Sequence, residues 1–277
     1  MTPYRYQRRY AGPLQAVIFD WAGTVIDYGC LAPVEAFVEL FRREGLALSP
    51  AQAREPMGTE KREHIRRLLA IPAVAADWQA AKGRAASEAD VDRLYREFLP
   101  IQLATIASNA RMIPGAVALV QRLRARGLKI GANTGYNREM LALCERAALA
   151  QGYAPDCSLA AEDAPRGRPW PDLALLNALR LGVSCVQACV KVDDTVAGIQ
   201  EGLSAGMWTV AVSLSGNELG LSLDDWARLP PGERSARAAA ASQRLKQAGA
   251  HYVIDSVAGL EACLDDIEMR LTCGERP

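Results

Sequence analysis

Three short apolar runs in this sequence each end in residues whose oxygen atoms could bind a metal ion or a phosphate. Asp20 follows AVIF, Thr134 follows KIGAN, and the pair Asp193-Asp194 follows ACVKV. A glycine or a helix start comes soon after each of them. Because ligands of open parallel sheets bind where the carboxyl ends of the strands meet, we expect these side chains to share one site.

Carboxylates at one spot repel one another unless a cation or a proton is present. Mg²⁺ suits a site built from carboxylate and carbonyl oxygens, and it also binds phosphate oxygens. The helix starts would supply N–H groups for an anion, and Arg168 in GRPWP would supply a rigid cation. A single strand-end aspartate is more often just a helix N-cap, but these coincident signals favour Mg²⁺-dependent phosphate chemistry.

Composition narrows the classes of partner and cofactor. The 277 residues carry a formal net charge of zero, which argues against nucleic acid or an anionic membrane as the main partner. Two histidines are too few for a histidine-rich metal site, and the seven cysteines form no CxxC pair. Residues 1–10 lack the apolar core of a secretory leader, and no apolar run reaches membrane-spanning length. We therefore expect reduced thiols and a cytoplasmic location.

The elements that must position these residues follow an alternating pattern. Apolar runs predict strands at 16–20, 128–134, 188–194, 208–214 and 252–255. Helical periodicity lies between or after them, at 115–127, 195–206 and 257–271, with a surface helix at 234–251. Strands separated by helices favour an α/β fold with a doubly wound parallel sheet.

The region from about residue 30 to 107 interrupts this alternation. Its helical patterns lie at 33–46, 61–71 and 91–106, and no convincing strand is present. A connection of this length is too long for a loop. We therefore predict an α/β core of residues 1–28 and 108–277, with an all-helical cap domain, 29–107, inserted after the first strand.

The order of these motifs resembles the haloacid dehalogenase superfamily, whose core is Rossmann-like, and within it the phosphonatase family. The resemblance covers nearly the whole chain and rests on FDWAGTVIDYG (19–29), AREPMGTEKREHI (53–65), TGYNREM (134–140), GRPWP (167–171), KVDDTVAGIQEG (191–202) and AGMWTVAV (205–212). It implies hydrolysis of the carbon–phosphorus bond of phosphonoacetaldehyde to acetaldehyde and phosphate.

The resemblance also implies a role for each matching residue. Asp20 is the nucleophile that forms an aspartyl-phosphate, and Lys61 forms a Schiff base with the aldehyde. Asp20, the backbone carbonyl of Ala22 and Asp194 hold Mg²⁺. The phosphate oxygens are held by Thr134, Arg168 and loop amides near Gly23, and the aldehyde side is lined by Met57, His64 and Tyr136. The resemblance further suggests a homodimer.

The alanine at position 22 distinguishes the predicted carbon–phosphorus hydrolase from an ordinary phosphatase. Phosphatases with such a nucleophile usually carry a second aspartate two positions on, as proton donor to the leaving group. A carbon leaving group that is activated as an imine needs no such donor. Two alternatives stay open: a phosphate-monoester phosphatase or phosphomutase of the same fold, and a catalytically weak phosphate-binding protein.

Two details of the site are left as expectations. The pKa of Lys61 should be depressed by desolvation and by nearby cations such as Arg62 or His64. Asp193 could lie just outside the metal ligands, and Gly198 stands where a further acid often lies.

Overall fold

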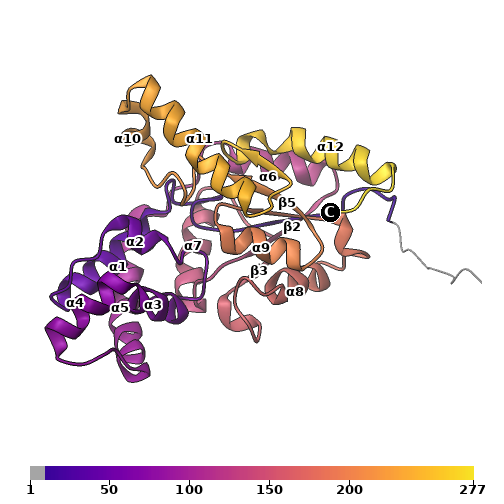
Figure 1. Ribbon diagram of the computed structural model, residues 1–277. Helices are drawn as coiled ribbons and strands as arrows, with labels where there is room; N and C mark the ends of the chain where they lie inside the picture. The colour runs from indigo at the N-terminus through magenta and orange to yellow at the C-terminus, as the bar shows by residue number, and fades with distance from the viewer. Residues whose placement is uncertain (1–9) are drawn as a thin grey trace, which may run out of the picture.

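Six parallel strands form the single sheet of the computed structural model, which describes residues 10–277 (Figure 1). Their spatial order is β3-β2-β1-β4-β5-β6. The central strand β1 is completely buried, and it pairs with β2 on one side and β4 on the other. The strands are β1 Ala16–Phe19, β2 Lys129–Asn133, β3 Cys157–Leu159, β4 Cys189–Asp193, β5 Trp208–Val212 and β6 Tyr252–Ile254.

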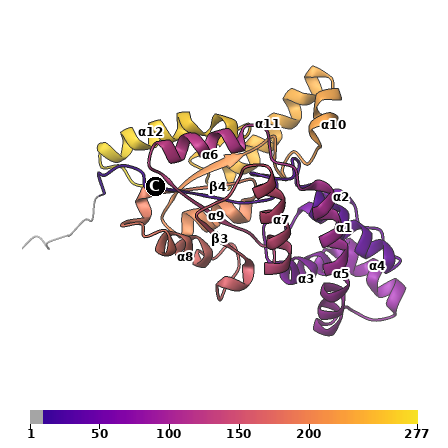
Figure 2. The ribbon, with the colours of Figure 1, turned by 180° about the vertical axis from the view of Figure 1, so that it is seen from behind.

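Helices cover both faces of the sheet. In Figure 1, α6 and α12 lie above it and α8 and α9 below it, and Figure 2 shows the same layers from behind. Within residues 10–277, no helix is long and apolar enough to cross a membrane. The helices outside the insertion are α6 Ala116–Ala125, α7 Arg138–Ala150, α8 Asp172–Arg180, α9 Val196–Ser204, α10 Leu223–Arg228, α11 Pro231–Gln247 and α12 Leu260–Thr272.

The predicted fold class is confirmed, and all five predicted strands are present, shorter at their ends than the apolar runs. The prediction missed β3, a three-residue edge strand that is only partly buried and so lacks an apolar run. It also left α7, α8 and α10 unassigned. The predicted surface helix is α11, and the helix after Ser256 begins as a 3₁₀ turn, capped by that serine, before α12.

Five helices and no strand lie between β1 and α6. They gather at one end of the sheet in Figure 1, where α1 packs along α5. Phe37 of α1 and Phe98 of α5 stack with ring centroids 4.4 Å apart. The prediction missed α2 and α4, and the helices are α1 Leu31–Arg43, α2 Pro50–Arg54, α3 Lys61–Ala70, α4 Pro72–Lys82 and α5 Glu88–Asn109.

The domain boundaries at 28/29 and 107/108 stay a prediction, and residues 1–9 lie outside the described part of the chain. The two connections to the helical insertion run side by side. The backbone N–H of Asp27 donates to the carbonyl of Arg111 at 2.9 Å, and that of Ile113 donates to Val25 at 2.8 Å. Both connections are therefore fixed to one another at the base of the insertion.

Asp27 joins this base to the first helix of the insertion. Its carboxylate is buried and accepts the backbone N–H groups of Leu31 and Ala32, both at 3.0 Å, and so caps the start of α1. Its φ of 59° is in the left-handed region. Burial outweighs the two hydrogen bonds and raises the pKa of Asp27 to about 7.

We predict that Asp27→Asn reduces the pH dependence of stability. Between about pH 4 and 7 the folded protein keeps a proton on Asp27 that the unfolded chain has released. The folded protein therefore becomes less stable as pH rises through that window. Urea unfolding at about pH 5 and about pH 8 measures the free energy of unfolding, which should fall between these pH values in wild type and fall less in the variant. Asp77→Asn, on an exposed position of α4, is the control and should match wild type. Equal pH dependence in Asp27→Asn and wild type would contradict this prediction.

Candidate active site

Asp20 directly follows β1 and opens a tight loop at the carboxyl end of the sheet. Its backbone N–H donates to the carbonyl of Val192 at 2.9 Å, which continues the pairing of β1 with β4. Gly23 in the loop has a φ of 86°, and a Cβ there would lie 2.1 Å from Oδ2 of Asp194. A glycine is required because the Asp194 carboxylate lies directly against the loop backbone.

Three buried carboxylates converge at this edge. Asp20, Asp193 and Asp194 each offer an oxygen atom, and these atoms lie within 4.8 Å of one another. Asp194 accepts a hydrogen bond from the Thr24 hydroxyl at 3.2 Å and from the Asn217 backbone N–H at 2.7 Å. The predicted convergence of the strand-end aspartates is therefore confirmed.

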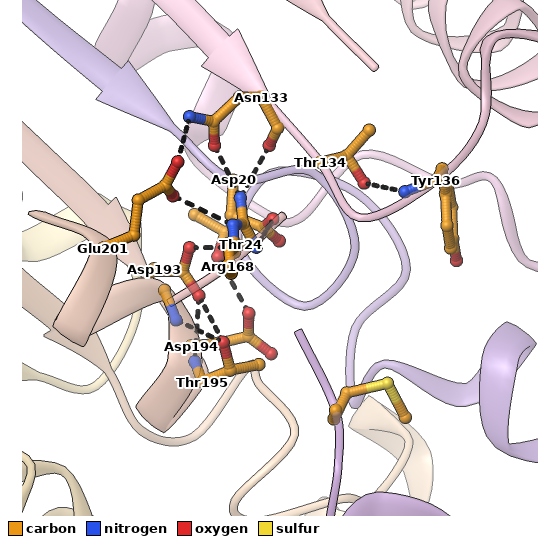
Figure 3. A network of polar contacts seen from close by, with 12 residues as sticks. Asp20, Thr24, Asn133, Thr134, Tyr136, Arg168, Asp193, Asp194, Thr195 and Glu201 are labelled. Carbon is orange, nitrogen blue, oxygen red and sulfur yellow. Dashed lines mark hydrogen bonds and ion pairs between the residues drawn. The ribbon is translucent and has the colours of Figure 1, made fainter. Parts of the chain in front are cut away.

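Arg168 is the centre of the polar network drawn in Figure 3. The side chain is buried, and Nη1 lies 2.7 Å from Oδ1 of Asp20 and 3.3 Å from Oδ2 of Asp193. Nε pairs with Glu201 at 2.9 Å, and Nη2 donates to the backbone carbonyl of Asn133 at 2.9 Å. The guanidinium thereby fixes residues that follow or end three strands.

Three members of this network were missed by sequence reasoning. Lys191 lies 3.0 Å from Asp193 and donates to Oδ1 of Asn133 at 2.7 Å, and Asn133 donates to Glu201 at 3.0 Å. All three side chains are completely buried. The available signal was a lysine in the middle of an apolar run, because a charge there must be paired inside the fold.

The charge balance of the network fits a divalent cation. Asp20, Asp193, Asp194 and Glu201 are four buried carboxylates against two buried cations, Arg168 and Lys191, which leaves two carboxylates in excess. Burial, reinforced by the nearby charges of Asp20 and Asp193, raises the pKa of Asp194 well above its ordinary value. A divalent ion beside these oxygens would balance that excess, and Asp20, Asp194 and the carbonyl of Ala22 would hold it.

The side chain of Asp193 lies directly against Gly198. A Cβ at Gly198 would lie 1.9 Å from Cγ of Asp193, so the carboxylate rests on the first turn of α9. Burial opposes ionisation of Asp193, but Arg168, Lys191 and hydrogen bonds from Thr195 lower its pKa overall. The Asp193 side chain therefore fills the space in which a side chain at position 198 would begin.

Lys61 begins α3 and is only 3% exposed. Its Nζ lies 3.9 Å from Sδ of Met57 and 5.1 Å from the ring centroid of Tyr136. Burial lowers the pKa of Lys61 to about 8, while Asp20 opposes that shift. A larger share of neutral, nucleophilic amine is therefore present near neutral pH than for a solvated lysine.

The cations expected to depress the pKa of Lys61 do not do so. Arg62 faces the outside of α3, where Nε pairs with Asp92 at 2.6 Å and Nη2 with Glu88 at 2.8 Å. Burial and the charge of Lys61 lower the pKa of His64 well below its ordinary value, so His64 is neutral near pH 7. The cation that contributes, behind burial, is Arg168.

The residues predicted to line the aldehyde side come from both the insertion and the core. His64 stacks on Phe37 with ring centroids 3.9 Å apart, its Nε2 lies 2.9 Å from the carbonyl of Ala53, and its Nδ1 has no hydrogen-bond partner among residues 10–277. Tyr136 is buried, and within the described part of the chain its hydroxyl is also without a partner. A cavity of about 20 Å³ is lined by twelve residues, including Asp20, Ala22, Met57, Lys61, Thr134, Tyr136 and Arg168. Met57 and Tyr136 line this small cavity beside Lys61, and His64 does not.

The groups predicted to hold phosphate already have polar partners within the protein. The Thr134 hydroxyl accepts from the backbone N–H of Tyr136 at 3.2 Å. The N–H of Gly23 donates within its own loop, to Ile26 at 2.7 Å and Asp27 at 3.1 Å. The roles of Thr134, Gly23 and Arg168 in holding phosphate stay predictions.

Comparisons with known proteins identify the class to which this arrangement belongs. The sequence model of the haloacid dehalogenase-like hydrolases matches residues 14–206, which include the loop that begins at Asp20, the insertion and the Asp193-Asp194 pair. The chain therefore belongs to the haloacid dehalogenase-like hydrolase family.

Two curated relatives that match this chain over nearly its whole length carry the same name. A phosphonoacetaldehyde hydrolase of Hahella chejuensis is 52% identical over 99% of this chain and 93% of its own length. One of Nitratidesulfovibrio vulgaris is 47% identical over 100% of this chain and 99% of its own. The crystal structure of a phosphonoacetaldehyde hydrolase like protein from Oleispira antarctica matches with a TM-score of 0.97 and 52% identity, covering 99% of this chain and 100% of that one.

We predict that Gly198→Ala destabilises the fold by about 1–3 kcal/mol, because the new Cβ collides with the Asp193 carboxylate. In the Asp193→Gly background the same change should cost far less, since the space is then free. The measurement is the free energy of unfolding of the two single variants and the double variant.

Gly232→Ala is the matched control, because a Cβ at this position in α11 meets no atom within 4 Å. It should leave stability unchanged or slightly raised. A cost for Gly198→Ala that is the same in both backgrounds would contradict steric exclusion by Asp193.

Proposed function

We propose that this chain hydrolyses the carbon–phosphorus bond of phosphonoacetaldehyde, giving acetaldehyde and phosphate, through a Schiff base on Lys61 and an aspartyl-phosphate on Asp20. The observation that carries the proposal is the buried amine of Lys61, which shares one small cavity with Asp20 while position 22 carries no acid. The names of the full-length relatives support the substrate.

The first step uses Lys61 as a nucleophile. Its neutral amine adds to the aldehyde carbon, and uptake of one proton with loss of one water leaves a protonated imine. Burial, which lowers the pKa of Lys61, favours the neutral amine that begins this step. Met57, His64 and Tyr136 would surround the aldehyde, and Tyr136 contributes the face of its ring beside the amine.

The second step joins Asp20 to phosphorus. A carboxylate oxygen of Asp20 forms a bond to phosphorus as the carbon–phosphorus bond breaks, and that electron pair moves into the imine to give a neutral enamine. Protonation of the enamine carbon and one water release acetaldehyde and restore Lys61. Another water cleaves the aspartyl-phosphate, so one water is consumed overall. No proton donor is needed at Ala22, because no alkoxide leaves.

The remaining residues bind and orient the substrate. Arg168, with Thr134 and amides near Gly23, would hold the phosphoryl oxygens, and the pairing of Arg168 with Asp20 keeps the nucleophile fixed. Mg²⁺, held by Asp20, Asp194 and the carbonyl of Ala22, would neutralise the crowded oxyanions. A cavity of about 20 Å³ has room for about one water molecule. The helical insertion must therefore move for the substrate to bind.

We also propose the homodimer and the cytoplasmic location that the resemblance and the cysteine content imply. The homodimer is tested by the mass of the protein in solution at low concentration. The substrate is a small molecule, and neither a nucleic acid nor a membrane has a part in the proposed reaction.

We predict that borohydride, added with phosphonoacetaldehyde, produces a reduced adduct on Lys61. Lys61→Arg should abolish both the adduct and phosphate release, because a guanidinium keeps the charge but cannot form the imine. Intact-protein and peptide mass spectrometry would locate the adduct, and phosphate release would be measured in parallel.

Asp20→Ala separates the two steps in the same experiment. It should abolish phosphate release but still allow the Lys61 adduct. A wild-type protein that hydrolyses phosphate esters and gives no adduct would favour the phosphatase alternative, and one that binds phosphate without any turnover would favour the phosphate-binding alternative. Full turnover by Asp20→Ala would contradict the assigned roles.

We predict that kcat/KM rises with pH and levels off above about pH 8. This ascending limb arises because the amine of Lys61 must be neutral and its pKa is lowered to about 8. Below that pH the rate should fall about tenfold per pH unit as the amine becomes protonated. Arg62→Ala is the control: the limb should not move, since Arg62 faces away from the cavity. A limb near the ordinary lysine value of about 10, or one that moves in Arg62→Ala, would show that burial of Lys61 is not the cause.

A further inference from the structure

Arg54, the last residue of α2, lies where the helical insertion meets the core, and it has no role in the proposed chemistry. Its half-buried guanidinium donates to main-chain oxygens from two separate segments. Nη1 donates to the carbonyl of Gly29 at 2.9 Å and to that of Cys30 at 3.3 Å, and Nη2 donates to the carbonyl of Gly220 at 3.0 Å. Within residues 10–277 no carboxylate forms an ion pair with it. Its hydrogen bonds therefore fix the position of the main chain in these two segments.

Both segments lie close around the guanidinium. A Cβ at Gly220 would lie 2.5 Å from Nε of Arg54, and one at Gly29 would lie 2.3 Å from the carbonyl oxygen of Leu221. The N–H of Gly29 donates to the carbonyl of Ser215 at 2.7 Å. The connection from the core to α1 and the core loop 215–221 are therefore in direct contact, and Arg54 bridges them.

The same loop continues to the carboxylate cluster. Oδ1 of Asn217 accepts from Nη1 of Arg54 at 3.2 Å, and the Asn217 side chain donates back to the Arg54 carbonyl at 3.4 Å. The backbone N–H of Asn217 donates to Oδ2 of Asp194 at 2.7 Å. One residue thus separates Arg54 from Asp194.

On its other side, Arg54 begins the turn that leads to Lys61. The N–H of Met57 donates to the Arg54 carbonyl at 3.0 Å, and the hydroxyl of Thr59 donates to Pro56 at 2.7 Å. Lys61 follows at the start of α3, with its amine beside the sulfur of Met57. A shift of Arg54 would therefore shift the amine relative to Asp20.

We propose that Arg54 is a positioning residue that sets the Lys61 amine in register with Asp20 and Asp194 when the insertion is closed on the core. This inference rests on the proposed function. A planar guanidinium reaches the connection and the loop at once, whereas a lysine ammonium at the same position reaches one of them.

Imine formation needs only the aldehyde and Lys61, which belongs to the insertion. Bond cleavage also needs phosphorus in line with Asp20, and a misplacement of about 1 Å can cost about 100-fold in such a step. Loss of Arg54 should therefore slow cleavage much more than imine formation, which is a signature that a purely structural role does not give.

The test compares Arg54→Ala, Arg54→Lys and Asn217→Ala with wild type, measuring phosphate release and the borohydride-trapped Lys61 adduct. Arg54→Ala should lower kcat for phosphate release about 100-fold while the adduct still forms at saturating substrate. Arg54→Lys should recover part of that loss. The fold-loss in kcat of the double variant, Arg54→Ala with Asn217→Ala, should be smaller than the product of the two single fold-losses, because both changes remove the same connection.

Arg237→Ala is the matched control, since this arginine of α11 lines the same surface groove as Arg54 but pairs with Glu233. It should leave both measurements at wild-type values. Unchanged kcat in folded Arg54→Ala, or equal loss of adduct and phosphate release with no recovery in Arg54→Lys, would overturn the inference. If Arg54→Ala does not fold, Arg54→Lys alone must show the selective loss of cleavage. A wild-type protein that gives no adduct would instead refute the proposed function.

Discussion

The structure depends on a guanidinium buried among carboxylates. Arg168 pairs with Asp20, Asp193 and Glu201, and all four residues are buried, so water screens these charges little. A buried ion pair is stable only when its polar atoms are satisfied, and here the backbone of Asn133 and the amine of Lys191 complete the network. Asp20 is consequently held by residues of the α/β core and not by the helical insertion.

The amine of Lys61 is surrounded quite differently. Its Nζ lies beside the uncharged side chains of Met57, Phe37 and Tyr136, and burial lowers its pKa. The two halves of the site are thus opposite in character: a core rich in paired charge and an insertion that desolvates one amine. Burial favours the neutral amine of Lys61 that its proposed step needs, whereas it raises the pKa of Asp20 to about 6, so the Asp20 carboxylate is mostly ionised only above that pH.

The sequence was sufficient for the sheet and for the aspartates at its edge, because strand-end position follows from apolar runs alone. The strand β3 was not predictable in this way, since three partly buried residues form no pattern. Lys61 could be selected only by resemblance, as a lysine in a charged helix start is ordinarily solvated. Glu201 and Asn133 were missed because each is satisfied by the other across 68 residues of sequence, a distance that periodicity does not report.

Carboxylates packed directly on glycines also limit how this sequence can change over time. Gly23 and Gly216 leave room for Asp194 as Gly198 does for Asp193, since a Cβ at any of the three would fall within 2.2 Å of an aspartate side chain. A side chain at position 198 destabilises the fold unless position 193 has first lost its carboxylate, so the order of substitutions is constrained by space. We expect such pairs to vary together among descendants of this chain, although none of the three glycines has any chemistry of its own.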